Sequence, residues 1–400
     1  MNKKISLGLT LALMILSVTV TFAITMAVSK NVYNKIITNL SLRDSASYAI
    51  DEIDRLVSNY FYGNADDRAS HITSALVEGY VNGLGDSNSR YLSSEKYADY
   101  TARLKGDLTG IGIETYFDPL QGVLQVAYVY EDSPAATAGL QQGDVISEIN
   151  GTAVTAKNYS TLTGQLYGDK LSSVKILYIR SGIEYTVEPM MGFTVPSVVY
   201  QLQESYGYIK INGFFQSTPA EFENAVDKLK EQGAGSYIID LRGTSEGTVQ
   251  YAAATLDVLV PAPSGSQALA TTYDKNGNKV DTYTAESGSV NTAFAVLINS
   301  ATAGPAELFA CDLRDISSAY LVGITTKGIG TAQKAFPLDN GDAVILSVAR
   351  IEPYNPNSVY DTVGLEPTHL CEAAVDASPC LWLVPAEKDV QLTQAKALLG

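Results

Sequence analysis

From about Val198 onward, short apolar runs typical of β-strands alternate with runs typical of helices. The strand-like runs include YGYIKI, SYIIDL, AFAVLIN, AYLVGI and AVILSVARI, and the helix-like runs PAEFENAVDKLKEQ and GPAELFACDLRD lie between such strands. Strands that alternate with helices predict a sheet covered by helices, which is the α/β class. A final run, EKDVQLTQAKALL, predicts a short helix at the end of the chain.

The amino-acid composition argues against several classes of function. The 400 residues include 27 basic and 43 acidic side chains, and the net charge of −16 argues against nucleic-acid binding, which needs a basic face. The two histidines, His71 and His369, and the three cysteines form neither an HExxH nor a CxxC pattern. Because a zinc site usually needs three or four closely spaced ligands, we expect neither a metal nor another cofactor.

An uncharged stretch of 24 residues, Ile5 to Val28, follows Lys3 and Lys4. As a helix it is roughly 36 Å long, enough to cross the hydrocarbon core of a bilayer. We therefore expect residues 1–30 to be a membrane anchor, with a cleaved signal segment as the alternative. The two lysines place the N-terminus in the cytoplasm. The sequence thus predicts a single-pass protein of the cell membrane whose C-terminal domains are extracytoplasmic.

Changes in the spacing of apolar residues and in the frequency of turn residues divide the rest of the chain into segments. Residues 31–105 show helical spacing of apolar side chains, and residues 106–190 show short β-rich runs between Gly and Asn-Gly turns. The α/β core then occupies 191–370 and the helical tail 371–400. In an extracytoplasmic setting Cys371 and Cys380 are able to pair, whereas Cys311 lies in an apolar helical run and is expected to be buried.

The β-rich segment contains a long and specific motif. It reads SPAATAGLQQGDVI at 133–146 and ING at 149–151, with GIGI upstream at 110–113. These residues resemble a PDZ domain of the bacterial protease-associated type. The resemblance implies a groove in which a peptide adds as a strand, its terminal carboxylate bound by backbone N–H groups near Gly110, Ile111, Gly112 and Ile113. The same glycines also suit a tight turn between strands.

Motifs on both sides of this segment resemble C-terminal processing peptidases, also called tail-specific proteases. GLGDSNSRYL at 83–92 is similar to the family's GLDPHSxYL, and GYIKI at 207–211 with Phe214 is similar to GYIRIxxF. IDLR at 239–242 resembles the LDLR strand end, and DVQL at 389–392 resembles DxQL. The likeness runs in family order over about residues 40–400 and implies a serine-peptidase type of core.

The chemistry that this resemblance implies is a serine nucleophile, activated by a neutral lysine and oriented with it by a glutamine. The nucleophile motif VNxxSASASE aligns with INSATAGPAE at 298–307 and puts Gly304 at the nucleophile position. The lysine motif TxGKGTVQ aligns with TKGIGTAQ at 326–333 and puts Ile329 at the lysine position and Gln333 at the glutamine position. The spacing of 25 residues between Gly304 and Ile329 follows the family pattern.

Neither substituted residue can perform that chemistry, since glycine has no nucleophile and isoleucine no base. The turn that would help to hold the oxyanion reads TSEG at 244–247, so its residues are Glu246 and Gly247. A carboxylate at Glu246 would repel negative charge that develops there. Gly304 and Pro305 instead suit a plain helix start. The sequence therefore predicts a pseudoenzyme.

Two other pairs of residues are candidates to replace the missing nucleophile and base. Thr302 and Lys327 are also 25 residues apart, and on a strand Lys327 would share a face with Ile329. GTSEG at 243–247 matches the GxSxG pattern of a nucleophile elbow, with Ser245 as nucleophile and His369 as its only downstream histidine. The simpler interpretation makes Lys327 a solvated strand-end charge and His369 part of a surface loop.

Two hypotheses about function follow. In the first, the chain is a catalytically silent homologue that binds the C-termini of extracytoplasmic polypeptides through its PDZ groove, as an adaptor or as the partner of an active protease relative. In the second, it is an active serine-type endopeptidase that uses Thr302 and Lys327. The missing nucleophile favours the first.

Overall fold

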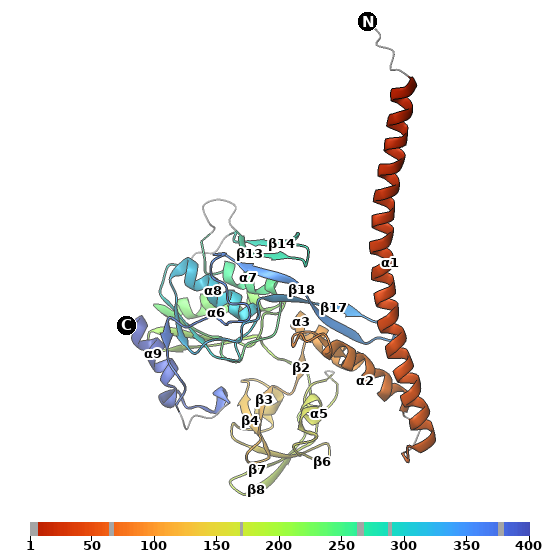
Figure 1. Cartoon of the computed structure of the whole chain (residues 1–400). Coiled ribbons are helices and arrows are strands. Elements are labelled where there is room, and N and C mark those ends of the chain that lie inside the picture. Colours follow the sequence, from red (N-terminus) through yellow and green to blue (C-terminus); the bar gives the residue numbers. More distant parts are fainter. Residues whose placement is uncertain (1–6, 64–67, 169–170, 262–267, 287–289, 375–379) are drawn as a thin grey trace. The chain divides into compact units, whose positions relative to one another are not determined.

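The computed structural model of the chain describes residues 7–63, 68–168, 171–261, 268–286, 290–374 and 380–400. The chain divides into two compact units, Met1–Thr73 and Ser74–Gly400. The first unit consists of helix α1, Leu7–Tyr60, and the beginning of α2, Arg68–Asn82 (Figure 1). The second unit holds every strand of the described chain.

The predicted membrane anchor is not supported. Among the described residues, no helix combines the length and the apolar character that crossing a bilayer requires. Helix α1 continues without a break far beyond Val28 and includes charged residues such as Lys35 and Arg43, so position 30 is not an element boundary. Lys3 and Lys4, on which the predicted orientation depends, lie outside the described residues.

The core of the second unit is a six-stranded sheet in the order β10-β11-β12-β15-β16-β19. Strand β10 is antiparallel to β11, and the other pairs are parallel. The bounds of these strands are β10 Val198–Gln203, β11 Tyr206–Ile211, β12 Ser236–Asp240, β15 Phe294–Ile298, β16 Tyr320–Gly323 and β19 His369–Leu370. This arrangement confirms the α/β class predicted from the alternating runs.

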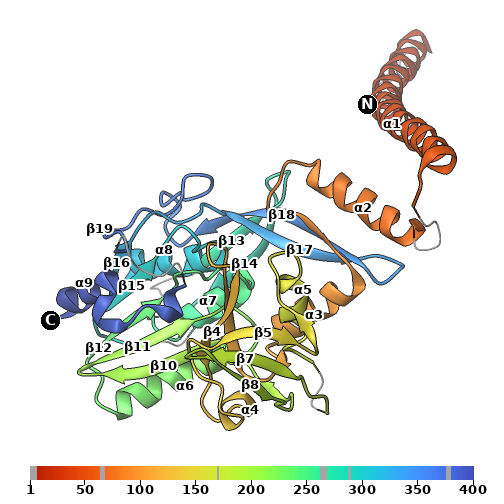
Figure 2. The same cartoon turned by 90° about the horizontal axis from the view of Figure 1, so that it is seen from below.

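Both faces of this sheet are covered, as expected for parallel strands made almost wholly of apolar residues. On one face, side chains such as Ile239 and Val296 pack against helices α6, α7 and α8. On the other face, Ile238 and Leu297 pack against Leu392 of the C-terminal helix α9 (Figure 2). The helices span α6 Thr218–Glu231, α7 Val249–Asp257, α8 Pro305–Ser317 and α9 Val390–Leu399.

An antiparallel sheet that the sequence analysis did not foresee lies beside the core. Its order is β1-β18-β13-β14, and β17 pairs with β18. The strands are β1 Arg90–Leu92, β13 Ala268–Tyr273, β14 Lys279–Thr284, β17 Thr331–Pro337 and β18 Ala343–Pro353. Strand β1 precedes helix α3, Ser94–Lys105, so the GLGDSNSRYL motif leads directly into this sheet.

The PDZ-like segment forms its own sheet in the order β3-β4-β5-β7-β8, with β6 paired to β5. Ser133 caps the short helix α4, Pro134–Thr137, by accepting the N–H of Ala136, as the Ser-Pro signal predicts. The other elements are β2 Thr109–Gly110, β3 Ile113–Asp118, β4 Val123–Val129, β5 Val145–Ile149, β6 Thr152–Ala153, α5 Tyr159–Gly164, β7 Ile176–Arg180, β8 Ile183–Val187 and β9 Phe193–Thr194.

The C-terminal tail is bound to the core by a buried ion-pair network. Arg242, which follows β12, contacts Asp240 at 2.6 Å and Asp389 at 2.8 Å, and it donates to Oε1 of Gln391 at 3.0 Å. The IDLR and DVQL motifs, far apart in sequence, therefore form one cluster. Within the described residues no disulfide joins Cys371 to Cys380, so the pairing that we considered is absent, whereas Cys311 is fully buried as predicted.

Candidate active site

The predicted nucleophile position lies in a sharp turn between β15 and α8. Gly304 has φ +58° and ψ −114°, a backbone conformation that L side chains rarely adopt. Nucleophile elbows are strained strand-to-helix turns of this kind. A Cβ built on Gly304 would meet only one neighbour within 4 Å, Cγ2 of Ile329 at 3.9 Å. The backbone can therefore display a side chain here, but none is present.

Glu307 fixes the geometry around this turn. Its buried carboxylate accepts the N–H of Gly304 at 2.8 Å, of Gly328 at 2.6 Å and of Ile329 at 2.7 Å. It also accepts the hydroxyl of Thr326. One side chain thus holds the start of α8 against the segment that carries Ile329, which explains how two positions 25 residues apart come into contact.

The expectation that Lys327 and Ile329 share a strand is wrong. Strand β17 begins only at Thr331, and the residues before it form a loop. The N–H of Lys327 donates to the carbonyl of Thr302 at 3.0 Å, and the next two N–H groups bind Glu307. Because these donors are directed to α8 and its turn, they are not available for pairing with a neighbouring strand.

Gln333 lies on β17 as the motif alignment predicts. Its Nε2 donates to the carbonyl of Thr331 at 2.8 Å and lies 3.0 Å from the hydroxyl of the same residue. A cavity of about 310 Å³ has Gly304, Ile329, Gln333, Glu246 and Gly247 among its lining residues. The structure therefore brings together all the predicted residues of the catalytic and oxyanion positions.

The turn predicted to hold the oxyanion offers one backbone donor, and a second one is missing. Gly247 has φ +119°, and a Cβ there would lie 2.2 Å from the carbonyl oxygen of Phe214, so only glycine fits. In the described part of the chain, the Gly247 N–H has no hydrogen-bond acceptor and stays available. The second donor of such a site is the N–H of the residue after the nucleophile, and here that residue is Pro305, which has none.

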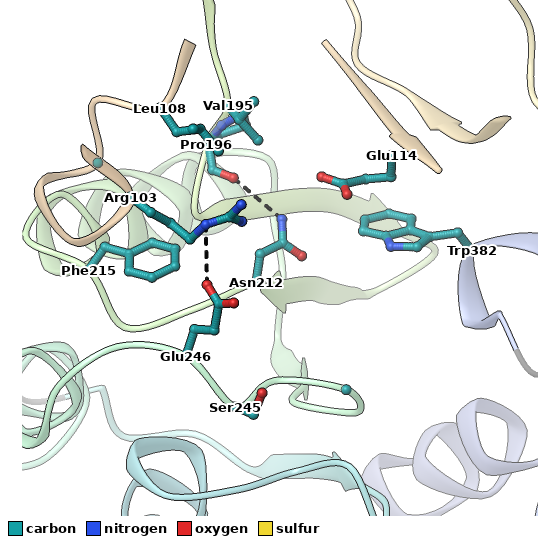
Figure 3. Close-up of a pocket in the computed structure, with 12 residues that line it drawn as sticks. Arg103, Leu108, Glu114, Val195, Pro196, Asn212, Phe215, Ser245, Glu246 and Trp382 are labelled. Atoms are coloured by element: carbon teal, nitrogen blue, oxygen red, sulfur yellow. Dashed lines mark hydrogen bonds and ion pairs between the residues drawn. The ribbon is translucent and has the colours of Figure 1, made fainter. Parts of the chain in front are cut away.

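Glu246 points from this turn toward helix α3. Its Oε2 lies 3.4 Å from Nε of Arg103, and both side chains are partly exposed. The pair borders a second cavity of about 220 Å³, with Ser245 beside it and Glu114 and Trp382 farther along the lining (Figure 3). Arg103 and Trp382 were not singled out by the sequence analysis, because no motif connects them with the catalytic positions.

The substitute pair Thr302 and Lys327 lacks a free nucleophile. The Thr302 hydroxyl is buried, donates to the carbonyl of Leu241 at 2.8 Å and accepts the N–H of Asn299 at 3.0 Å. Both of these bonds hold the turn before α8. This observation weighs against the shifted dyad.

The Ser245 and His369 pair is not assembled either. Ser245 lines the two cavities described above, whereas His369 lies on the edge strand β19. There its Nδ1 is 3.0 Å from the hydroxyl of Thr368, and its ring packs edge-on against Tyr320. His369 therefore belongs to a strand and not to the surface loop that the simpler interpretation predicts, and its contacts with Thr368 and Tyr320 are structural.

One N–H group of the predicted carboxylate loop in the PDZ-like segment is already bound within the protein. The N–H of Ile111 donates to the carbonyl of Leu166, just after α5, at 3.2 Å. The side chains of Ile111 and Ile113 are buried in the core of this unit, while Gly110 and Gly112 allow close approaches of the neighbouring chain. These contacts suit the structural role that the sequence also allows for the loop, a tight turn between strands.

Two aromatic rings lie where the sequence predicts the peptide groove, between β3 and α5. Strand β3 is the end strand of its sheet, which leaves one edge open for an added strand. Phe117 of β3 stacks on Tyr159 of α5, with ring centroids 4.2 Å apart and planes at 10°. An added strand would have to displace this stack or pass beside it.

A third cavity, of about 470 Å³, contains buried charges that the sequence analysis missed. Lys210 lines it and donates to the carbonyl of Arg242 at 2.6 Å and to the Thr244 hydroxyl at 3.2 Å. Burial lowers the pKa of this amine to about 8. Desolvation by burial is the largest single effect on the Asp240 carboxyl and raises its pKa. The combined attraction of Arg242 and Lys210 outweighs this effect, so the pKa falls to about 2. Lys210 belongs to the GYIKI motif, which indicates only the family resemblance and assigns no role to the lysine.

Comparisons with known proteins agree with this architecture. Residues 205–370 match the model of peptidase family S41, and residues 125–176 match the model of the PDZ domain. The core of the chain therefore matches the S41 peptidases and the inserted segment matches PDZ domains, in agreement with the motif resemblance.

The relatives are processing proteases. The carboxy-terminal processing protease CtpA of Bacillus subtilis is 28% identical over 300 residues, which cover 74% of this chain and 63% of that protein. The carboxyl-terminal-processing protease of Synechocystis sp. is 27% identical over 75% of this chain and 71% of that protein. A solved structure described as an S41 protease from Bacteroides fragilis shares the fold, with a TM-score of 0.57 and 19% identity over 84% of this chain and 92% of that one.

Proposed function

We propose that this chain is a catalytically silent S41 homologue that binds the C-terminal ends of polypeptides. The observation that carries the proposal is that Gly304, whose Cβ position lies 3.9 Å from Cγ2 of Ile329, and Ile329 itself occupy the two motif positions where the family resemblance implies the reacting groups. The turn, the glutamate that holds it and the glutamine position are all present, while the hydroxyl and the amine are absent. The absence of an N–H on Pro305 supports the same conclusion.

The alternative is an active serine-type endopeptidase that uses Thr302 and Lys327. A buried hydroxyl that donates to one backbone carbonyl and accepts another backbone N–H is a poor nucleophile, because attack would require both bonds to break. We therefore favour binding without cleavage.

Incubation of the full chain with casein, and separately with a fluorophosphonate probe, tests the loss of chemistry. We expect neither cleavage nor labelling. Stoichiometric labelling of Thr302 or Ser245 would contradict the proposal.

The peptide-binding part of the proposal is tested with peptides that end in an apolar residue. The free carboxylate forms should bind, and the amidated forms should bind at least severalfold more weakly, because charge-assisted hydrogen bonds contribute about 1.5–3 kcal/mol. Equal affinity of both forms would remove the support for a PDZ groove. An active protease relative is a partner to be tested by co-purification.

The extracytoplasmic location stays a prediction from the sequence. Exposure of the second unit to an added protease in intact cells, compared with lysed cells, tests it. Protection in intact cells would contradict it.

A further inference from the structure

The cavity at the silent site has an unusual charge for this protein. The whole chain carries 27 basic and 43 acidic residues, yet the cavity is lined by three cationic side chains, Arg90, Arg103 and Lys327, and by a single carboxylate, Glu246. An excess of positive charge in one concave region of an acidic protein attracts anions.

Two of these cations are not neutralised. Among the residues that the structure describes, neither Arg90 nor Lys327 has a carboxylate within ion-pair distance. Arg103 and Glu246 compensate each other at 3.4 Å. The cavity therefore keeps a surplus of two positive charges.

The guanidinium of Arg90 and the backbone of Lys327 are held by their surroundings. The guanidinium of Arg90 lies over the ring of Tyr100, 5.8 Å from its centroid, and both residues line the cavity. The backbone of Lys327 is held by its hydrogen bond to Thr302, and the following residue is held by Glu307. A ligand would meet side chains whose attachment points do not have to be reorganised.

Space and a backbone donor are also present. The missing side chain at Gly304 leaves its Cβ position open, and the free N–H of Gly247 lines the same cavity. The N-terminus of α8 adds little, because its first N–H groups are bound to Glu307 and Ala303 or are absent at Pro305. The attraction for an anion thus comes from the side chains of Arg90 and Lys327.

The cavity adjoins a second cavity. It shares Arg103, Ser245 and Glu246 with the 220 Å³ cavity, which continues to Trp382. A polypeptide segment therefore fits this region better than an isolated small anion, because it can occupy both cavities.

We propose that the silent catalytic cavity is a binding site for the carboxylates of an acidic polypeptide segment, recognised by Arg90 and Lys327. This inference goes beyond the PDZ groove, since it uses residues outside 106–190. The carboxylate has two possible sources, the C-terminal end of the ligand or its Asp and Glu side chains.

Fluorescence anisotropy with the full chain distinguishes these sources. The probe is fluorescein-labelled Gly-Glu-Glu-Glu-Gly-Asn, whose polar terminal residue does not suit the PDZ groove, compared with its amidated form and with the form that has three glutamines. A loss of affinity on amidation assigns the terminal carboxylate, and a loss in the glutamine form assigns the side chains. Binding that is equal for all three peptides overturns the proposal.

Variants of the protein locate the site. The Arg90→Gln, Lys327→Gln double variant should bind the probe about tenfold more weakly, and Glu246→Gln should bind it about threefold more tightly because a repelling carboxylate is removed. The matched control is Lys228→Gln with Arg350→Gln, which removes two exposed cations that do not line the cavity. An equal loss in the control pair, or no loss in the cavity pair, overturns the proposal.

The PDZ hypothesis fails or succeeds independently of this result. It depends on peptides with an apolar terminal residue and on residues 106–190, which all three of these protein variants leave unchanged. Wild-type binding of the glutamate probe together with equal binding of apolar acid and amide peptides would support the cavity and refute the groove.

Discussion

The Cβ position of Gly304 lies 3.9 Å from Cγ2 of Ile329, so the residues that replace the nucleophile and the base still face each other. Their separation in the sequence, 25 residues, is that of the family pattern. The two motif positions thus lie next to each other, and neither Gly304 nor Ile329 carries a hydroxyl or an amine. Restoring both groups is therefore a direct test of what else has been lost.

Gly304→Ser combined with Ile329→Lys should leave the protein nearly inactive. Pro305 still offers no N–H to an oxyanion, and Glu246 still places a carboxylate at the turn. Loss of one oxyanion donor alone costs about 10²–10³ in rate. Casein turnover by the purified double variant measures this.

Adding Glu246→Gly and Pro305→Ala to that variant should produce slow proteolysis. These changes restore a backbone donor and remove the negative charge. The serine must also adopt the positive φ of Gly304, which costs about 1–3 kcal/mol, so a lower melting temperature is expected. Fast turnover by the double variant alone would show that Pro305 and Glu246 do not impair the site.

Glu307→Ala should destabilise the fold by at least about 3 kcal/mol. The carboxylate is buried and accepts three backbone N–H groups and one hydroxyl, all of which would lose their partner. Urea unfolding gives the free energy of unfolding, and hydrogen exchange at Gly328 and Ile329 should become faster. The control Glu223→Ala removes an exposed glutamate from α6 and should change stability by less than about 0.5 kcal/mol. Comparable losses in both variants would contradict this role of Glu307.

The positions of the candidate active site were predictable because motif spacing fixes the register of the alignment. Asn299 and Glu307 both pointed to Gly304, and the alternating strands and helices gave the α/β class. The shape of the segment around Ile329 was not predictable, since a strand and a loop are equally compatible with TKGIGTAQ. The deciding contact comes from Glu307, a residue of a different element.

Contacts between distant segments were beyond sequence reasoning. Arg103 meets Glu246 and Trp382 packs against Tyr128, and in neither pair does a sequence pattern connect the partners. The sequence identifies the tail motif DVQL but not its structural role, which is to place Asp389 in an ion pair with Arg242. A single sequence shows which residues are unusual, but it does not show which of them are in contact in the folded protein.

Asp312→Asn should make the protein more stable, and increasingly so as the pH rises from 5 to 8. Burial raises the pKa of the Asp312 carboxyl well above its usual value, and its Oδ2 has no hydrogen-bond partner among the described residues. The folded state therefore keeps a proton that the unfolded state releases above about pH 4.

Since the unfolded state binds fewer protons in this range, wild-type stability decreases as the pH rises, by at most about 1.4 kcal/mol per pH unit. Asparagine removes this dependence and can still accept the N–H of Tyr354, which Oδ1 accepts at 2.9 Å. Urea unfolding of both proteins at several pH values measures the difference. A difference that is constant with pH would show that Asp312 is ionised in the folded protein.

Tyr159→Ala should strengthen the binding of peptides with a free C-terminus, by up to about tenfold. The stack of Tyr159 on Phe117 joins α5 to β3, and such aromatic pairs contribute about 0.5–1.5 kcal/mol, which a strand that enters between these elements has to overcome. Tyr185→Ala is the matched control, because Tyr185 stacks on Tyr178 in the same unit at 5.4 Å but lies on β8. Anisotropy titrations of both variants with one apolar peptide measure the effect. Weaker binding by Tyr159→Ala, with the control unchanged, would mean that the tyrosine contacts the peptide and does not block it.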